Sequence, residues 1–363
     1  MSAIPLVEAR QRLPARPDSG PRGRECSEGR GMQMAGTSMK RRTVLACALA
    51  GAVLARRAVA QTGTRVFRIG WVSPQRETSL TPFVAAFRSA LEELGLVEGR
   101  NLVIEFRYGN DVATSVPALV DELLRLPVDL IVAQGAAVTT INTMALKVPV
   151  VYVTSGDPVA SGFADSLARP HSNMTGVTLM AIELNRKRLE LLREIVPKLR
   201  RVAFIANPEH PGEDRERSFS IEAGKQLGLV VDFFQTRTRI ELDAALAAMA
   251  ADRPQAISVF SDGFAVQNRQ TIIDAASRMR IPVAAAWPVF ADSGALFSYG
   301  PRLSDSYRRL AYYVDRIQKG AKPADLPIQQ PLTFEMVLNL KTAHSLGLVI
   351  PAAVLLRADR VLE

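Results

Sequence analysis

Short apolar segments rich in β-branched residues recur along the chain from about residue 66 onward. They alternate with stretches in which apolar residues return every three to four positions. The first pattern is typical of strands that are covered on both faces, and the second is typical of amphipathic helices. The predicted strands begin near Val66, Leu102, Asp129, Pro149 and Asn173 in the first half, and near Arg201, Leu229, Ala256, Pro282 and Ala295 in the second.

Helical patterns separate these strands, and the clearest are marked by Phe83, Phe87, Leu91 and Leu94 before Gly95, by Leu184, Leu191, Leu192 and Ile195 before Pro197, and by Ile221 and Leu227 before Gly228. Alternation of this kind builds parallel sheets with helices on both faces. About 300 residues follow Gln61, enough for two domains. We therefore predict an α/β fold with two Rossmann-like lobes. A closed eight-stranded barrel is the alternative, and about ten strands are too many for it.

Residues 150–178, VVYVTSGDPVASGFADSLARPHSNMTGVT, predict a buried strand, a polar turn, a short helix, an Arg-Pro turn and a second strand. In open α/β sheets, ligands bind beyond the carboxyl ends of the strands. The hydroxyls and the carboxylate after Val153 are therefore placed where a ligand would bind.

The amino-acid sequence of this segment also contains motifs of a known family. SGDPV, GFADSLARP and NMTGV resemble a signature of the substrate-binding proteins of ABC transporters, in the family with tryptophan- and phenylalanine-binding members. The C-terminal residues 296–363 are similar to the same family, most clearly in GAKP, DLP, NLKTA and RAD. The resemblance runs from about Phe67 to the last residue. His171 departs from it, because the family usually has glycine after the Arg-Pro.

The resemblance implies a type 1 periplasmic-binding-protein fold with three hinge crossovers, expected near residues 178–182, 291–299 and 324–330. The first lobe is then expected to contain residues 61–180 plus 294–326, and the second lobe residues 181–293 plus 327–363. Residues 1–38 lack apolar periodicity and are expected to be disordered or to precede the true start codon.

The charge of the chain is uneven. Its formal net charge is +9, but residues 1–60 hold 11 of the 45 basic and only 4 of the 36 acidic residues. The remainder is nearly neutral, so no nucleic-acid-binding face is expected. Cys26 and Cys47 both lie in the same N-terminal segment, which leaves the body of the protein without a thiol site or a disulfide.

A signal peptide is predicted over residues 39–60. Lys40-Arg41-Arg42 precedes the apolar stretch 43–54, which is shorter than the roughly 20 residues that span a bilayer, and Ala58-Val59-Ala60 offers a cleavage site. The basic pair resembles a twin-arginine export signal, with general export as the alternative. The mature protein is expected to be a soluble periplasmic monomer, cut near Ala60.

The candidate ligand-binding residues follow the predicted strands in both lobes. They are Ser73, Gln134, Ser155, Asp157, Asn207, Ser261, Asp262 and Trp287. Backbone N–H groups at helix starts, together with such side chains, suit a small polar molecule. For Ser73, Asn207 and Ser261, capping of the following helix is an explanation at least as good as ligand contact, and for Asp157 and Asp262 stabilisation of the helix dipole is the alternative.

Asp157 is the favoured acceptor for a ligand ammonium because it lies in the family-like segment. Trp287 is either a platform for a ligand ring or a lobe-packing residue. The three histidines, His171, His210 and His344, are too far apart for a metal site, and His210 lies in a turn-rich loop where exposure is expected.

No motif of a hydrolase nucleophile, a phosphate loop or a dinucleotide site is present, so no catalytic residue, cofactor or metal is predicted. The function expected is reversible capture of a small polar solute for an ABC permease and its ATPase, and the resemblance implies an amino acid as that solute. A repressor on the same fold would need a DNA-reading helix-turn-helix where the export signal lies. An exported enzyme or a ligand-sensing domain is the remaining alternative.

Overall fold

The computed structural model describes residues 65–110, 112–170, 173–180, 182–260 and 262–363, and all of them belong to one compact unit. The expected extension, the signal peptide and both cysteines lie outside the described residues, as do His171 and Ser261. Within the described part of the chain, no helix is long and apolar enough to cross a membrane.

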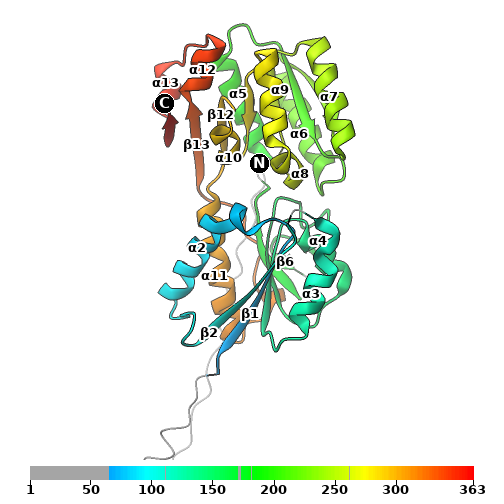
Figure 1. Ribbon diagram of the computed structural model, residues 1–363, viewed down its shortest axis with the longest axis vertical. Coiled ribbons are helices and arrows are strands. Elements are labelled where there is room, and N and C mark those ends of the chain that lie inside the picture. The colour runs from blue at the N-terminus through cyan, green and yellow to red at the C-terminus, as the bar shows by residue number, and fades with distance from the viewer. Residues whose placement is uncertain (1–64, 111, 171–172, 181, 261) are drawn as a thin grey trace, which may run out of the picture. The chain divides into compact units, whose positions relative to one another are not determined.

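The first lobe is built on a five-stranded sheet of the described chain, in the order β2-β1-β3-β4-β7, with every neighbouring pair parallel. Figure 1 shows this sheet in the lower part of the molecule. Its strands are β1 (Phe67–Ser73), β2 (Leu102–Tyr108), β3 (Leu130–Gln134), β4 (Val150–Thr154) and β7 (Met174–Thr178). Each begins within a residue of its predicted start.

The second lobe contains a seven-stranded sheet among the described residues, in the order β14-β13-β12-β11-β10-β8-β9. Only the β12–β13 pair is antiparallel. The strands are β8 (Arg201–Ala206), β9 (Val230–Gln235), β10 (Ala256–Val259), β11 (Val283–Ala285), β12 (Phe297–Pro301), β13 (Phe334–Asn339) and β14 (Arg360–Leu362). The sequence predicted five of these strands and missed the last two.

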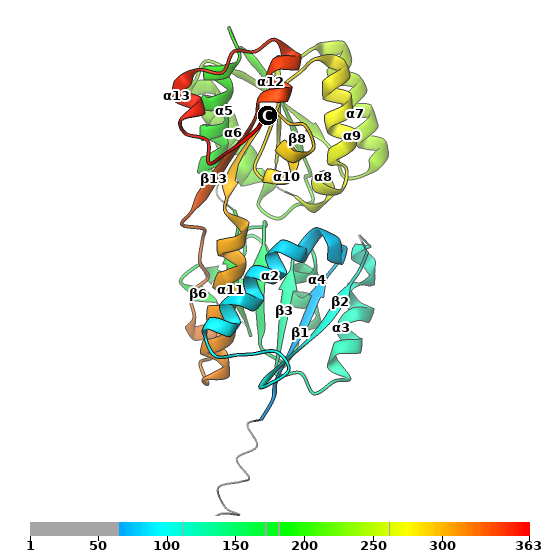
Figure 2. The same ribbon diagram turned by 60° about the vertical axis from the view of Figure 1, so that its left-hand side comes forward.

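Helices cover both faces of each sheet (Figures 1 and 2). On the first sheet, one apolar core lies under two helices that pack on each other, and the opposite core lies under two shorter helices with a 3-10 turn before them. These elements are α2 (Glu77–Glu93) with α11 (Leu303–Gln318), and α3 (Val116–Leu124) with α4 (Ala137–Met144) and η1 (Ala113–Ser115).

Two further cores flank the second sheet. One lies under α5 (Glu183–Ile195), α6 (Glu213–Gln226), α12 (Leu340–Leu346) and α13 (Ala352–Leu355), and the other under α7 (Arg239–Asp252), α8 (Gly263–Gln267), α9 (Arg269–Met279) and α10 (Pro288–Asp292). The predicted α/β class with two Rossmann-like lobes is therefore confirmed.

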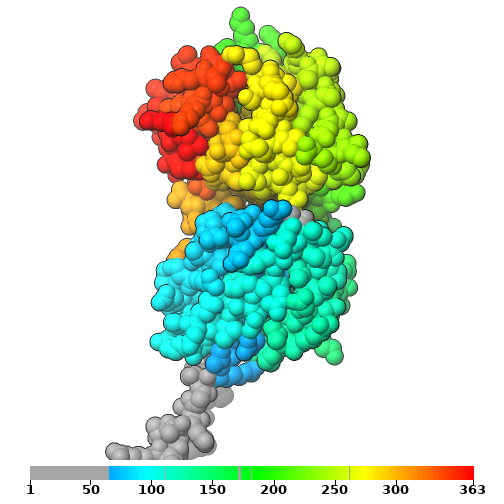
Figure 3. Space-filling model, in the orientation of Figure 1, coloured from blue at the N-terminus to red at the C-terminus, as the bar shows by residue number. Residues whose placement is uncertain are grey.

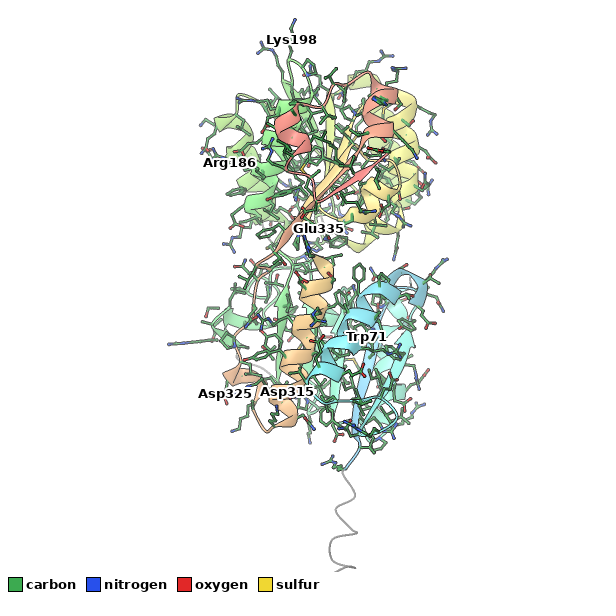
Figure 4. The ribbon with its side chains drawn as sticks, turned by 90° about the vertical axis from the view of Figure 1, so that its left-hand side faces the viewer. Trp71, Arg186, Lys198, Asp315, Asp325 and Glu335 are labelled. Atoms are coloured by element: carbon green, nitrogen blue, oxygen red, sulfur yellow. The ribbon has the colours of Figure 1, made fainter. Side chains whose placement is uncertain are left out.

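The chain passes between the lobes three times. The first passage joins β7 to α5, as expected. The second lies between β12 and α11, at residues 301–303, because β12 pairs with β11 in the second sheet. The third lies between Gln329, which bridges to Val177 in the first lobe, and β13. Figure 4 labels Glu335 on β13 at this junction.

These positions correct two expectations. The second passage was placed at 291–299, with residues 294–301 assigned to the first lobe, and the third at 324–330, with residues 327–329 assigned to the second lobe. The chain in fact remains in the second sheet until β12 ends at Pro301. It then remains with the first lobe through η2 (Pro323–Asp325) and the Gln329 bridge.

The segment between β4 and β7 also differs from its prediction. In place of a short helix there is one helical turn, closed by the hydrogen bond from Ser161 N to Asp157 O and stopped at Gly162, whose φ of 73° is left-handed. A small hairpin of β5 (Ala164–Ser166) and β6 (Arg169–Pro170) follows. One turn buries too little apolar surface to continue as a helix.

Candidate interlobe ligand site

A cavity of about 450 Å³ lies at the carboxyl ends of strands from both lobes. Its lining includes five of the eight predicted binding residues: Gln134 and Ser155 from the first lobe, and Asn207, Asp262 and Trp287 from the second. Figure 3 shows the two lobes in contact along the seam between them. Strand ends in open α/β sheets are the usual ligand position, and this cavity has the size of a small-molecule site.

Ser73 lies one layer behind this cavity. It is fully buried at the end of β1, and its Oγ donates to Gln134 Oε1 over 2.7 Å while accepting from Gln75 N over 3.0 Å. The amide oxygen of Gln134 is thus engaged by Ser73, and its amino group also hydrogen-bonds with Tyr307, which leaves one amino hydrogen for a ligand. Ser73 thus orients a lining residue and does not itself line the cavity.

Ser155 meets His210 across the lobes. Ser155 Oγ and His210 Nε2 are 2.8 Å apart, and His210 comes from the loop after β8. Burial lowers the pKa of His210 to about 4, so the ring is neutral at neutral pH. The expectation that His210 is exposed was wrong, because the first lobe covers its loop. A serine next to a histidine could suggest a nucleophile and its base, but a pKa near 4 makes a poor general base at neutral pH.

Asp262 combines two of the roles that its position predicted. Its Oδ1 accepts from Ala265 N over 2.9 Å and so caps α8, and the residue also lines the cavity. Only 4 % of Asp262 is exposed, and burial raises the pKa of its carboxyl to about 6. A buried carboxylate beside a cavity favours a cationic group there.

Asn207 and Trp287 line the same side of the cavity. Asn207 Oδ1 accepts from Glu209 N over 3.0 Å and fixes the turn after β8. Trp287 precedes α10 and packs against the apolar core of the first lobe, which is the predicted lobe-packing role. Its Nε1 is buried and meets no acceptor in the described chain. Trp287 therefore presents an unpaired donor as well as an apolar ring to this region.

Asp157 does not line the cavity. Its Oδ1 accepts from Val159 N over 2.9 Å, and its Oδ2 lies 3.1 Å from Arg215 Nη1 in the second lobe. Asp157 N also donates to Pro211 O across the lobes. The carboxylate is thus engaged in a turn and an interlobe ion pair, which differs from the expected contact with a ligand ammonium.

The described lining of the cavity is acidic. It includes the carboxylates of Glu209 and Asp262 and a neutral His210, but no lysine or arginine. Sequence reasoning missed His210, Phe264 and Ala136, the residue before α4, which also line it. The pattern of apolar and polar positions could not identify Phe264 as a lining residue, because an apolar residue at such a position is expected in the core.

No cluster of three or more potential metal-binding side chains occurs in the described residues. The polar groups of the cavity are hydrogen-bond donors and acceptors without metal-ligand geometry. The arrangement fits non-covalent binding of a small molecule that carries a positive group and an apolar body.

A family model described as ABC transporter substrate binding protein matches residues 72–362. A curated relative, the tyrosine-binding protein of Clostridioides difficile (strain R20291), is 23% identical over 276 residues, which are 74% of this chain and 78% of the relative.

Two solved structures have similar folds. One is an ABC domain from Streptococcus pneumoniae in complex with L-Trp, with a TM-score of 0.76 and 22% identity over 82% of this chain and 100% of the other. The other is a conserved domain protein from Vibrio cholerae, with a TM-score of 0.74 and 21% identity over 82% of this chain and 99% of the other.

Proposed function

The chain belongs to the family of ABC transporter substrate-binding proteins, and from this premise we propose that it captures an amino acid reversibly in the interlobe cavity for import. The observation that carries the proposal is the cavity itself. Both lobes line it, and it combines a buried carboxylate, an aromatic ring and small polar side chains.

An amino acid with an apolar or aromatic side chain suits this cavity best. Trp287 and Phe264 offer aromatic surface, and Val153 and Leu179 add aliphatic surface on the opposite side. The relatives support the same class, since one is named for tyrosine and another was solved with L-Trp. Aromatic rings pack well in such surroundings and gain more than their buried area alone provides.

In this proposal Asp262 accepts the ligand ammonium, the role that the sequence had suggested for Asp157. Asp262 is the buried carboxylate of the lining, and each carboxylate oxygen can accept more than one hydrogen bond, so the bonds from the backbone of Ala265 and Phe264 leave acceptor capacity for an ammonium. Gln134 lines the cavity from the other lobe and donates to the ligand the amino hydrogen that Tyr307 does not accept. Contacts from both lobes stabilise the closed arrangement more than an open one, so that a ligand shifts the population toward closure.

The partners proposed are a membrane permease and its cytoplasmic ATPase, which would receive the ligand from the closed form. Export is part of the proposal. It rests on the basic and apolar pattern of residues 39–60, which precede the described residues. N-terminal sequencing of protein recovered from the periplasm should show that the mature chain begins at Gln61. A mature form that retains residues 1–38 would contradict the predicted signal peptide.

Calorimetric titration with single compounds tests the ligand class. L-tryptophan, L-tyrosine, L-phenylalanine and L-leucine are compared with succinate, glucose and adenine. At least one of the amino acids should bind and raise the melting temperature, since a ligand at a hundredfold excess over its Kd stabilises by about 2.7 kcal/mol. Binding of succinate alone would contradict the proposal, because the acidic lining disfavours a dianion. Turnover of a bound compound would favour an enzyme instead.

A further inference from the structure

A second, much smaller cavity lies directly behind Ser155. Its volume is about 10 Å³, and it shares Ser155 and Leu179 with the main cavity. Arg188 and Glu216 of the second lobe line its other side. A hollow of this size holds one water molecule when polar partners surround it. Asp262 lines the larger cavity and Arg188 lines the smaller one.

Arg188 is an unusual residue to find there, because only 2 % of it is exposed. Its Nη1 donates to Tyr299 O over 3.1 Å, and its Nη2 donates to Asn185 Oδ1. Its Nε is buried without an acceptor in the described chain. A buried N–H that lacks a partner is costly, so a group that accepts from it in the adjacent hollow would be stabilising.

The charge of Arg188 is only partly compensated within the protein. Asn185 connects it to Glu216, since Asn185 Nδ2 donates to Glu216 Oε1 over 2.9 Å. Burial raises the pKa of Glu216 to about 7, so that this acid is partly protonated at neutral pH. Positive charge therefore remains on Arg188 in the small cavity.

We propose that Arg188 recognises the carboxylate of the ligand through one water molecule in the small cavity, and that it thereby selects zwitterionic amino acids over amines and amides. This inference rests on the proposed function. The described lining of the main cavity has no basic side chain, and Arg188 is the basic residue of the adjoining one. The water accepts from Arg188 Nε and donates to the ligand carboxylate beside Ser155.

This arrangement also connects the ligand to a hinge segment. Tyr299, whose carbonyl accepts from Arg188, lies on β12 just before the chain passes to the first lobe. A ligand that draws Arg188 toward the main cavity would act on the strand next to that passage. The lobes and the ligand carboxylate are then coupled through one side chain.

The test compares each amino acid with its own amide. L-tryptophan and L-tyrosine, with L-tryptophanamide and L-tyrosinamide, are titrated into the purified protein at pH 7.5. The wild type should prefer the acid by about tenfold or more, as a charge-assisted contact predicts. Arg188→Met should reduce this preference below about threefold without weakening the amide.

Arg186→Met is the matched control. Arg186 lies two residues earlier on α5, and its side chain is 47 % exposed and hydrogen-bonds with Glu190 and Gln226. Figure 4 labels it at the edge of the second lobe. This variant should keep the full preference for the acid. Equal affinity of the wild type for acid and amide, or an unchanged preference in Arg188→Met, would overturn the inference while leaving the proposed function intact. A wild type that binds no amino acid would overturn the proposed function first.

A second variant keeps the test decisive if Arg188→Met does not fold. Glu216→Gln removes the acid that compensates Arg188 and retains its acceptor for Asn185. At pH 8.5, where wild-type Glu216 is ionised, this variant should increase the preference for the acid by about threefold or more. An unchanged or smaller preference would contradict a role of Arg188 charge in ligand selection.

Discussion

The carboxylate of Asp157 lies 3.1 Å from the guanidinium of Arg215 and joins the turn after β4 in the first lobe to α6 in the second. The same carboxylate accepts from Val159 N within its own turn. Arg215 is 68 % exposed, so the ion pair is largely screened by solvent. The turn contact is therefore the more important role of Asp157.

Substitutions at Asp157 should affect stability more than ligand binding. Asp157→Ala removes the acceptor of the turn and should lower the free energy of unfolding by about 0.5–2 kcal/mol. Asp157→Asn keeps an acceptor and loses only the ion pair, as Arg215→Gln does, so both should cost less than about 1 kcal/mol. Urea unfolding measures these differences, and calorimetry should show ligand affinity within about threefold of wild type. A large loss of affinity in Asp157→Asn would instead support the ligand contact that the sequence predicted for Asp157.

The affinity for an amino acid should depend on pH through Asp262. Its pKa of about 6 without ligand falls when an ammonium binds, so the affinity should decrease as the pH drops below 6. Asp262→Asn should weaken binding by about tenfold or more and remove this dependence, while Asn still caps α8. Titrations at pH 5 and pH 8 test this, with Glu209→Gln at the exposed rim as control. An unchanged pH profile in Asp262→Asn would show that another group accepts the ligand ammonium.

Much of the fold could be predicted from the sequence because strand and helix periods are local properties. The buried β-branched segments gave nearly every strand start of the two sheets, and Gly95 follows the end of α2 as expected. The buried faces of individual helices were predicted less accurately. Leu94 and Ile221 are 42 % and 47 % exposed, although their spacing suggested burial. Spacing defines an apolar stripe, whereas packing decides where it ends.

The site could be predicted only in part, because it depends on contacts between lobes. Strand-end positions identified Gln134, Asn207 and Asp262 correctly as lining residues. His210 and Arg188 could not be found in this way, since a histidine in a turn-rich loop and an arginine on a helix both resemble surface residues. The first lobe partly covers His210, and Arg188 is buried against β12, and both contacts join residues that are distant in sequence.

Glu216 should make the ligand-free protein less stable at high pH. Its folded pKa of about 7 lies above its ordinary value, so its contribution is fully present below pH 4.5 and is lost as the pH rises through 7. Glu216→Gln resembles the protonated form. Its free energy of unfolding relative to wild type should therefore increase between pH 5 and pH 9. His210, whose pKa is lowered, acts in the opposite direction in both proteins and cancels in this comparison. A difference that stays flat with pH would show that Glu216 is ionised throughout.

Close contact of the lobes should require glycine at position 212. A Cβ there would lie 2.5 Å from Met180 Cε and 2.8 Å from Asp157 Cβ, both across the interface. Gly212→Ala should therefore weaken ligand binding and enlarge the ligand-bound radius of gyration in small-angle scattering. Gly162→Ala is the matched control, because its φ of 73° is also left-handed but its Cβ would meet nothing within 4 Å. Both variants should lose about 1–2 kcal/mol of stability. Equal affinity in the two variants would contradict the need for this contact.

Fluorescence should report ligand binding through Trp287 alone. The chain has two tryptophans. Trp71 is fully buried in the first-lobe core and lies inside the lobe in Figure 4, between the rings of Phe87 and Tyr307. Trp287 lines the cavity and is only partly buried, so a ligand should shield it. L-phenylalanine, which does not emit where tryptophan does, should reduce acrylamide quenching in the wild type. Trp287→Phe should abolish this response and weaken binding, because the ring loses contact area. A response that persists in Trp287→Phe would have to come from Trp71 and would mean that binding repacks the first-lobe core.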